Sequence, residues 1–406
     1  MTTRIGYLAA GPTPGARRAL WLLALTLVLC LATWFSATAV FAQLRDEWDL
    51  SSAAGAWLTI AVQLGFVAGA LASSLVNLAD LLPPARLIAA SAVGAAVVNA
   101  LLLTVGSAGP AIALRFVTGF FVAGIYPPAL KFISTWFKTG RGVALGVLVG
   151  ALTLGSASPH LINALGGLEW ETVVLVASLL SLAGAGVALL VPEGPFPFPR
   201  AVFDPRQVGR TVRNRGVRLA SLGYFGHMWE LYGAWAWMHI FFTDVTNDNA
   251  RVGASIAFAV VGIGALGCYF GGRLGDTWGR TRTTAAAMTL SGLCALSIGW
   301  LDGSPSSIAV TIGLVWGFAV VADSAQFSTM VTELADQAYV GTALTLQLAL
   351  GFTLTVVTIW LIPVVESSHG WGWAFALLAP GPALGAIAMM RLKNQPEATN
   401  LADGRG

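Results

Sequence analysis

The chain has 406 residues, of which 56% are hydrophobic and only 10% are charged, and its formal net charge is +3. Soluble proteins have about 25% charged residues, so this chain has too few charges to cover a soluble surface of its size. The composition excludes an ordinary water-soluble protein and indicates a membrane protein with many spanning segments.

Twelve apolar segments are long enough to cross a bilayer, since a spanning helix needs about 20 mostly apolar residues. They are predicted at residues 18–43, 52–78, 85–105, 107–136, 141–166, 170–191, 216–243, 252–272, 283–301, 305–334, 338–364 and 371–391. Ala, Leu, Gly and Val dominate and two-residue alternation is missing, which predicts helices. The 47 glycines suit close packing between helices.

Twelve spans place both termini on one side of the membrane, and most of the 22 Lys and Arg residues fall in loops on that side. Basic loops stay in the cytoplasm, so both termini are predicted to be cytoplasmic. The net charge then reflects topology and gives no reason to expect a nucleic-acid partner. The first segment is expected to be an uncleaved helix, because no small-residue cleavage site follows it.

The chain is predicted to consist of two related halves. Residues 192–218 are rich in Pro and then in Arg, which is typical of a cytoplasmic linker. They separate an N-terminal six-helix bundle, residues 1–191, from a C-terminal six-helix bundle, residues 219–406. The halves resemble each other, since Trp34 matches Trp229 and "LAD" ending at Asp80 matches "LGD" ending at Asp276.

Two motifs resemble those of the major facilitator superfamily. "GGRLGDTWGRTR", from Gly271 to Arg282, is similar to the signature loop that follows a spanning helix in that family, and "LVNLADLLPPAR" is a weaker first-half copy. "RFVTGFFVAG", beginning at Arg115, is similar to a segment of the fourth helix. The resemblance implies an all-α fold of twelve helices in two pseudo-symmetric bundles, transport by alternating access, and a central cavity lined by the first, fourth, seventh and tenth helices.

The same resemblance implies a conformational latch at the signature loop, formed by Gly272, Asp276, Gly279, Arg280 and the first-half Asp80. Physical chemistry also gives a reason to expect a latch at this loop. An aspartate there can accept hydrogen bonds from the N-terminus of a neighbouring helix, where negative charge is favoured, and two glycines allow a tight turn. The alternative is that these charges only fix the topology.

The seventh segment contains "GYFGHMWELYGAW", which places His227 and Glu230 at mid-depth of a spanning helix. Helical spacing puts them on one face with Tyr224 and Trp237, and the family's cavity predicts that this face meets water or substrate. Ionisable groups in a membrane are costly and commonly carry protons, so both are candidates for proton coupling, and His227 is also a candidate for binding substrate. The alternative is a buried pair that only joins helices.

The fourth segment presents Arg115 and Tyr126 on one helical face, and Pro127 and Pro128 are predicted to bend the helix. A guanidinium stays charged and can hold a carboxylate in two places, which makes Arg115 and Tyr126 candidates for binding an anion. A purely structural partner for Arg115 is equally compatible with the sequence.

Further candidates are spread over several segments. In the tenth, Asp323 is a second proton site or a partner of Lys131, and Gln326, on the same face, is a candidate for binding substrate. Gln63 and Gln347 are hydrogen-bonding candidates, and Gln347 is a candidate for binding substrate, although a lone Gln in a span more often joins helices. Among the deep tryptophans, Trp34 and Trp229 are expected to bind substrate in an aromatic cavity, although they suit core packing equally well. The cysteines, Cys30, Cys268 and Cys294, have the spacing of packing residues.

The leading hypothesis is a secondary active transporter, a symporter that moves a small organic or inorganic anion with protons. No phosphate-binding loop, metal-ligand cluster or hydrolase motif occurs, so we expect no enzymatic activity, no cofactor and no metal. The expected partners are a small-molecule solute, protons and the lipid bilayer around a monomer. "VADSAQFSTMVTELADQAYVGTALTLQLALGF" resembles the bacterial branch with nitrate, nitrite and cyanate porters, which implies the bacterial inner membrane.

Two alternatives remain open from the sequence. The first is proton-coupled efflux of hydrophobic or cationic compounds, in which acidic groups attract a cation and tryptophans stack on it. The second is a sensor or assembly factor that does not transport. Nitrate itself fits poorly, because nitrate porters have an arginine within the second span, where this chain has Gln63.

Overall fold

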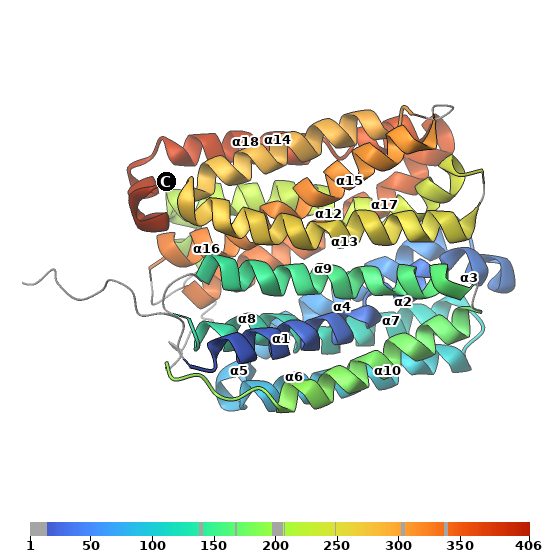
Figure 1. Cartoon of the computed structure of the whole chain (residues 1–406), viewed down its shortest axis with the longest axis horizontal. Coiled ribbons are helices and arrows are strands. Elements are labelled where there is room, and N and C mark those ends of the chain that lie inside the picture. Colours follow the sequence, from blue (N-terminus) through green and yellow to red (C-terminus); the bar gives the residue numbers. More distant parts are fainter. Residues whose placement is uncertain are drawn as a thin grey trace, which may run out of the picture.

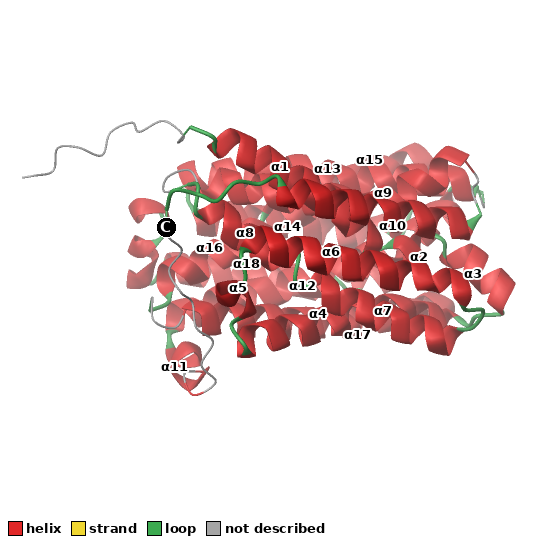
Figure 2. Cartoon of the chain, turned by 90° about the horizontal axis from the view of Figure 1, so that it is seen from below, coloured by secondary structure: helices red, strands yellow, loops and turns green. Residues whose placement is uncertain are grey.

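The computed structural model describes residues 14–137, 141–166, 169–196, 206, 208–247, 249–301, 305–336 and 340–406. The regular structure of this part of the chain is helical, which confirms the predicted fold class. The helices run along one common axis (Figure 1), and a view turned by 90° shows the same bundle (Figure 2). We call the end of the bundle that carries the C-terminus the inner end, and the opposite end, near α3, the outer end.

The first half of the chain forms a bundle with short breaks. Its elements are α1 (Ala16–Cys30), η1 (Leu31–Thr33), α2 (Ser36–Ala39), α3 (Phe41–Trp48), α4 (Ser52–Leu75), α5 (Leu78–Leu81), α6 (Pro84–Ala100), η2 (Leu101–Thr104), α7 (Ala108–Val122), α8 (Tyr126–Ser134), α9 (Arg141–Gly166) and α10 (Trp170–Leu189).

The second half follows a short helix in the predicted linker. Its elements are α11 (Val208–Arg213), α12 (Arg215–Val245), α13 (Ala250–Thr277), α14 (Arg280–Ile298), α15 (Ser306–Ala322), α16 (Ser324–Leu334), α17 (Val340–Ala376), α18 (Pro380–Lys393), η4 (Pro396–Asn400) and η5 (Ala402–Gly404). Within α17 the backbone turns at Gly370, where φ is 79°, so α17 joins the last two predicted spans.

Nine helical stretches of the described residues are long and apolar enough to cross a membrane. One of them, Val340–Lys393, contains two predicted spans. The two remaining predicted spans are α12 and α14, whose sequences are more polar. These elements agree with the predicted arrangement of twelve spans.

Several predicted spans are interrupted, and three of the breaks lie next to candidate side chains. The first predicted span becomes α1, η1, α2 and α3. The fourth divides into α7 and α8. Pro127 and Pro128 lie in the first turn of α8, at the position of the predicted bend. The tenth divides into α15 and α16 at Asp323. The signature segment differs from its prediction as a loop, since α13 continues to Thr277.

The two halves contact each other through helices with small residues. Gly142, Gly146 and Gly150 recur every four residues on α9, which packs against α13. A Cβ at Gly146 would lie 2.6 Å from the carbonyl oxygen of Cys268, so the two backbones nearly touch. A second contact joins α4 to α17. The three cysteines are buried and unpaired, as expected of packing residues.

The close helix contacts predict a difference between two glycine substitutions. At Gly317 a Cβ would lie 1.8 Å from the carbonyl oxygen of Val260, whereas at Gly186 it would meet nothing within 4 Å. Gly317→Ala should therefore destabilise the protein by about 1–3 kcal/mol through overpacking. Gly186→Ala should leave the stability unchanged or raise it by up to about 1 kcal/mol, because alanine favours helix. Thermal unfolding in detergent measures both, and equal unfolding temperatures would contradict the predicted contact.

Candidate functional site between the two halves

Six aromatic side chains meet where the first half faces the second. Trp34 stacks on Tyr232 with ring centroids 5.7 Å apart and lies 5.8 Å from Phe352. Phe66 is 4.5 Å from Phe352. All of these rings are buried within the protein. We call this set the interface cluster: Trp34, Phe35, Phe66, Tyr232, Trp235 and Phe352.

Several hydrogen-bonding groups at the cluster have no partner in the described part of the protein. They are the indole nitrogens of Trp34 and Trp235 and both amide atoms of Gln63, which is one helical turn before Phe66 on α4. Leaving a buried polar group without a partner costs about 1–3 kcal/mol. Donors and acceptors of this kind, set among aromatic rings, are the typical lining of a small-molecule site.

Arg115 lies directly behind the cluster and is fully buried. Its Nη1 donates to the carbonyl oxygen of Thr33 at 2.8 Å and to Asn99 Oδ1 at 3.0 Å, and its Nη2 donates to the carbonyl oxygen of Trp34. The break after α1 supplies these carbonyls, because residues outside a regular helix leave them unused. Nε also reaches the Leu58 carbonyl at 3.5 Å. Arg115 thus fixes the backbone that carries the Trp34 ring.

All of these Arg115 partners are neutral. Within the described residues no carboxylate forms an ion pair with Arg115. The guanidinium therefore holds an uncompensated positive charge in the core of the first half, close to the interface cluster.

Glu230 faces α14 and α15 of its own half, which differs from the predicted orientation toward the chamber between the halves. Its Oε2 accepts a hydrogen bond from Ser291 Oγ at 2.9 Å, and its Oε1 accepts one from Trp316 Nε1 at 2.7 Å. The carboxyl group is buried, and both of these partners are neutral. The α12 residues that do face the first half include Tyr232, Trp235, Trp237 and His239.

His227 and Asp323 form a buried pair inside the second half. His227 Nδ1 lies 2.9 Å from Asp323 Oδ1, and its Nε2 lies 3.0 Å from Ser324 Oγ. Asp323 is placed by the break between α15 and α16. The structure thus joins two predicted proton-coupling residues directly, whereas Glu230 contacts a separate set of groups.

Tyr126 and Gln347 lie nearer the inner end of the interface between the halves. Tyr126 begins α8 and interacts electrostatically with Tyr224 of α12. Gln347 is buried on α17, and its Nε2 has no partner among the described residues. One turn further along α17, Gly351 packs against the Tyr224 ring, where a Cβ would lie 2.2 Å from Cε1.

Two predicted substrate-binding residues lie away from the interface cluster. Trp229 donates from Nε1 to the carbonyl oxygen of Leu377 at 3.0 Å, which places it within the second half. Gln326 is at the inner end, where its Nε2 donates to the Gly271 carbonyl at 3.0 Å and its Oε1 accepts from Arg280. The sequence prediction placed Gln326 on the same helical face as Asp323. That spacing does not apply, because a new helix, α16, begins directly after Asp323.

The signature segment forms a charged cluster at the inner end. Asp276 Oδ1 lies 3.2 Å from Arg280 Nη1, and Arg280 also binds both carboxylate oxygens of Glu333 at 2.7 and 2.8 Å. The Asp276 carboxylate lies against Gly142, where a Cβ would be 2.5 Å from Oδ1. Gly142 is in the first turn of α9, so a carboxylate of one half lies beside a helix N-terminus of the other, where negative charge is favoured.

The glycines of this segment have distinct structural reasons. Gly272 contacts the backbone of Gly142, and Gly279 has φ 107°, which a side chain rarely adopts. Arg405 donates from Nη1 to the carbonyl oxygen of Asp276, so the C-terminal segment covers the turn. Asp80 lies in α5, and its side chain is outside the described part of the structure.

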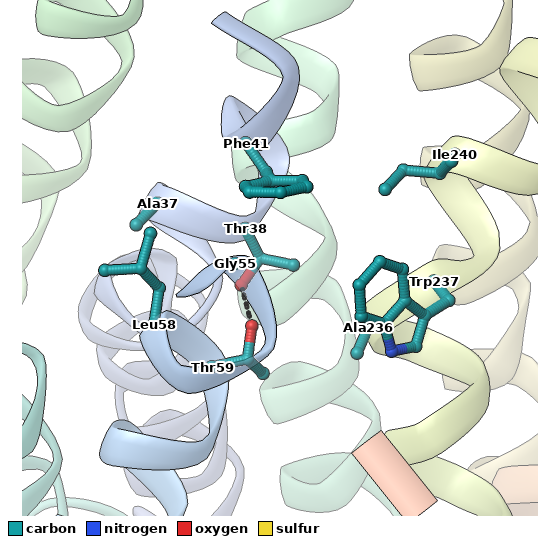
Figure 3. Close-up of a pocket in the computed structure, with 9 residues that line it drawn as sticks. All are labelled: Ala37, Thr38, Phe41, Gly55, Leu58, Thr59, Ala236, Trp237 and Ile240. Carbon is teal, nitrogen blue, oxygen red and sulfur yellow. Dashed lines mark hydrogen bonds between the residues drawn. The ribbon is translucent and has the colours of Figure 1, made fainter. Parts of the chain in front are cut away.

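The halves also meet at the outer end. A cavity of about 10 Å³ lies between α2, α3 and α4 of the first half and α12 of the second. Its lining side chains are drawn in Figure 3, where the dashed line joins Thr38 Oγ1 and Thr59 Oγ1, which are hydrogen-bonded at 2.7 Å. A space of this size holds about one water molecule. It is lined by Ala37, Thr38, Phe41, Gly55, Leu58, Thr59, Ala236, Trp237 and Ile240. At this level of the contact, therefore, side chains of the two halves pack against each other and leave little space.

Sequence reasoning missed most of the cluster, namely Phe35, Phe66, Tyr232 and Phe352. An apolar ring in a spanning helix has the same appearance in sequence whether it faces lipid or another helix. The one available signal was the spacing of Tyr224, Tyr232 and Trp235 on α12, which repeats at helical intervals.

Comparisons with known proteins agree with this architecture. The family model described as Major Facilitator Superfamily matches residues 22–356. An MFS-type transporter of Gibberella moniliformis is 26% identical over 226 residues, 53% of this chain and 52% of that protein. The MFS transporter asaE of Aspergillus flavus is 22% identical over 208 residues, 48% of this chain and 45% of that protein. The chain spans about half the length of these curated relatives.

Solved structures resemble the chain over nearly its whole length. The human organic anion transporter MFSD10 (TETRAN) has a TM-score of 0.72 at 15% identity, covering 93% of this chain and 100% of that one. The proton:xylose symporter XylE has a TM-score of 0.72 at 13% identity, with 94% and 96% covered. An inward-facing bacterial homolog of human Spinster has a TM-score of 0.64 at 16% identity, with 94% and 95% covered. At these identities the likeness shows the fold.

Proposed function

Because the chain belongs to the major facilitator superfamily, whose members are transporters rather than enzymes, we propose that it carries a small organic or inorganic anion by proton-coupled alternating access. The observation that carries this proposal is the interface cluster with its unpartnered polar groups. Trp34 Nε1, Trp235 Nε1 and Gln63 are buried between the halves, and a solute that hydrogen-bonds to them would remove the cost of burying them.

The charge of Arg115 supports an anion as the solute. Its donors are directed at neutral oxygen atoms, and one of these belongs to Trp34 in the cluster. A buried charge without a counter-charge is unfavourable, so a negative solute arriving on the other side of Trp34 is stabilised by it. In this role Arg115 attracts the anion through its field and does not need to touch it.

Proton coupling is assigned to the second half. Glu230 has only neutral partners, and Asp323 is paired with His227. Both acidic groups lie on or beside α12, which carries Tyr232 and Trp235 of the cluster. A proton that binds or leaves either group can therefore change the packing of α12 against the solute.

Efflux of hydrophobic or cationic compounds is a second candidate, because the cluster contains six aromatic rings and aromatic faces attract cations. It predicts that a cationic dye, and no anion, is moved. The non-transporting alternative predicts that neither is moved.

The proposal also includes the orientation of the protein and the membrane in which it lies. We assign the inner end, with both termini, to the cytoplasm on the basis of the basic loops, and we propose a monomer in a bacterial inner membrane. The two curated relatives come from fungi, so the source membrane is open to direct test by localisation.

Uptake into proteoliposomes with an imposed pH gradient tests the proposal, using monocarboxylates, inorganic oxyanions and cationic dyes. Gln63→Met removes both hydrogen-bonding atoms and nearly keeps the shape, whereas Trp34→Phe removes the indole N–H together with part of the ring. Each should lower anion uptake by at least about tenfold, the effect of one lost bond of about 1.4 kcal/mol. Trp21→Phe is the matched control, since Trp21 is 65% exposed on α1. Unchanged uptake in Gln63→Met and Trp34→Phe would remove the interface cluster from the proposal.

A further inference from the structure

Two buried histidines face each other across the halves, separate from the interface cluster and from the acidic groups of the second half. His160 belongs to α9 and His239 to α12, and their ring centroids lie 5.4 Å apart at an interplanar angle of 60°. Both side chains are more than nine-tenths buried. Each lies in the last two turns of its helix, near the outer end. The pair thus spans the contact that must separate when the protein opens outward.

Neither ring has its full set of partners. His160 Nδ1 and His239 Nε2 form no hydrogen bond within the described residues. His239 is hydrogen-bonded to the backbone of Ala250 at the start of α13, and His239 is also the titratable group that acts on His160.

Two acidic groups of the surrounding elements bind tryptophan side chains. Glu47 of α3 accepts from Trp170 Nε1 at 2.6 Å, and Asp244 of α12 accepts from Trp371 Nε1 at 2.8 Å. Arg251 on α13 is exposed. No ion pair joins either histidine to a carboxylate in the described part of the chain.

We propose that His160 and His239 form a proton-binding site that opens the outer end of the transporter. In the closed form a proton on one ring creates a buried charge without a counter-charge, which is unfavourable. A second proton adds a like charge on the neighbouring ring and raises this cost further. When α9 and α12 separate, water solvates both rings and removes this cost. Imidazole is the side chain that titrates near physiological pH, so outside acid favours the open form and alkaline conditions favour the closed form.

The histidine pair has a different role from the one proposed for Glu230 and Asp323. Those groups lie within the second half, whereas the histidine pair is divided between the halves and therefore responds to their separation. Opening by this pair needs only the alternating-access motion of the family. It is independent of whether the solute is an anion.

Distances between the halves test the inference without any solute. Spin labels are attached at Asp46→Cys on α3 and Arg251→Cys on α13, both exposed, in protein lacking Cys30, Cys268 and Cys294. Pulsed electron paramagnetic resonance then measures the ratio of long to short distances against pH. If opening takes up one proton, the ratio should rise about tenfold for each unit by which the pH is lowered through the transition.

The pair is removed in H160Q/H239Q, and the distances should then no longer respond to pH. His369→Gln is the matched control, because His369 is an exposed histidine on α17 outside the pair, and it should keep the full response. A full response in H160Q/H239Q would overturn the proposal. So would a pH-independent distance in the unchanged protein.

A second measurement needs no substitution of the pair. Nitrogen-15 spectra of labelled histidine should show two rings whose titration midpoints coincide with the midpoint of the distance change. Midpoints that differ from it by more than about one pH unit would overturn the inference, since linkage requires the same protons to drive the opening. Absence of anion uptake in the separate proteoliposome assay would contradict the proposed substrate and leave this result intact.

Discussion

Glu230→Gln should abolish solute accumulation driven by a pH gradient while leaving downhill exchange of solute across the same liposomes. Glutamine has nearly the same shape and can still accept from Trp316 Nε1 at the position of Oε1, so the packing of α12, α14 and α15 is kept. It cannot release a proton, and gradient-driven accumulation should therefore fall to the level of empty liposomes. Parallel measurements of accumulation and of exchange separate loss of coupling from loss of transport.

Glu171→Gln provides the control for Glu230→Gln. Glu171 lies in the first turn of α10, outside the second half, and its substitution should change neither accumulation nor exchange. Accumulation at the unchanged level in Glu230→Gln would show that Glu230 is only a structural acceptor for Ser291 and Trp316. The coupling role would then pass to the His227 and Asp323 pair.

Arg115→Met should destabilise the protein more than Glu230→Gln or Gly317→Ala. It removes a donor from the carbonyl oxygens of Thr33 and Trp34 and from Asn99 Oδ1, and the single hydroxyl proton of Ser36 can satisfy only one of these three acceptors. Each buried acceptor left without a donor costs about 1–3 kcal/mol, so two of them cost about 2–6 kcal/mol. Thermal unfolding in detergent should therefore occur at a clearly lower temperature, and uptake per folded molecule should also fall.

Arg115→Lys separates the two roles given to Arg115. Lysine keeps the positive charge but cannot reproduce the fixed fork of guanidinium donors. We expect intermediate stability with anion preference retained, because the field at the interface cluster depends on charge. Arg251→Met, at an exposed site on α13, is the control for removing an arginine. An Arg115→Met protein with normal stability and normal uptake would contradict both the network and its electrostatic role.

The sequence was sufficient for the fold because the medium restricts the possibilities. Apolar runs of helical length, basic loops on one side and a repeated motif predicted the two related halves, and the described helices agree. The contact of Asp276 with the first turn of α9 also followed from general physics, since a carboxylate is favoured at a helix N-terminus. Pro127 and Pro128 marked the break before α8 correctly.

The orientation of individual polar side chains could not be predicted as well from the sequence. Helical spacing puts His227 and Glu230 on one face of α12, but it cannot show which neighbouring helix meets that face. The answer depends on Ser291, Trp316 and Asp323, which are distant in sequence and satisfy these groups within the second half. The break in the first span was likewise unexpected, because it carries no proline and is stabilised by Arg115.

A density map of the protein with a transported anion bound is the most direct test of the central claim, which is that solute binds between the two halves at the interface cluster. We predict density for the anion between Trp34 and Tyr232, within hydrogen-bonding distance of Gln63 and on the side of Trp34 opposite to Arg115. Density enclosed within a single half, or on the lipid-facing surface with the cluster packed as it is now, would contradict it.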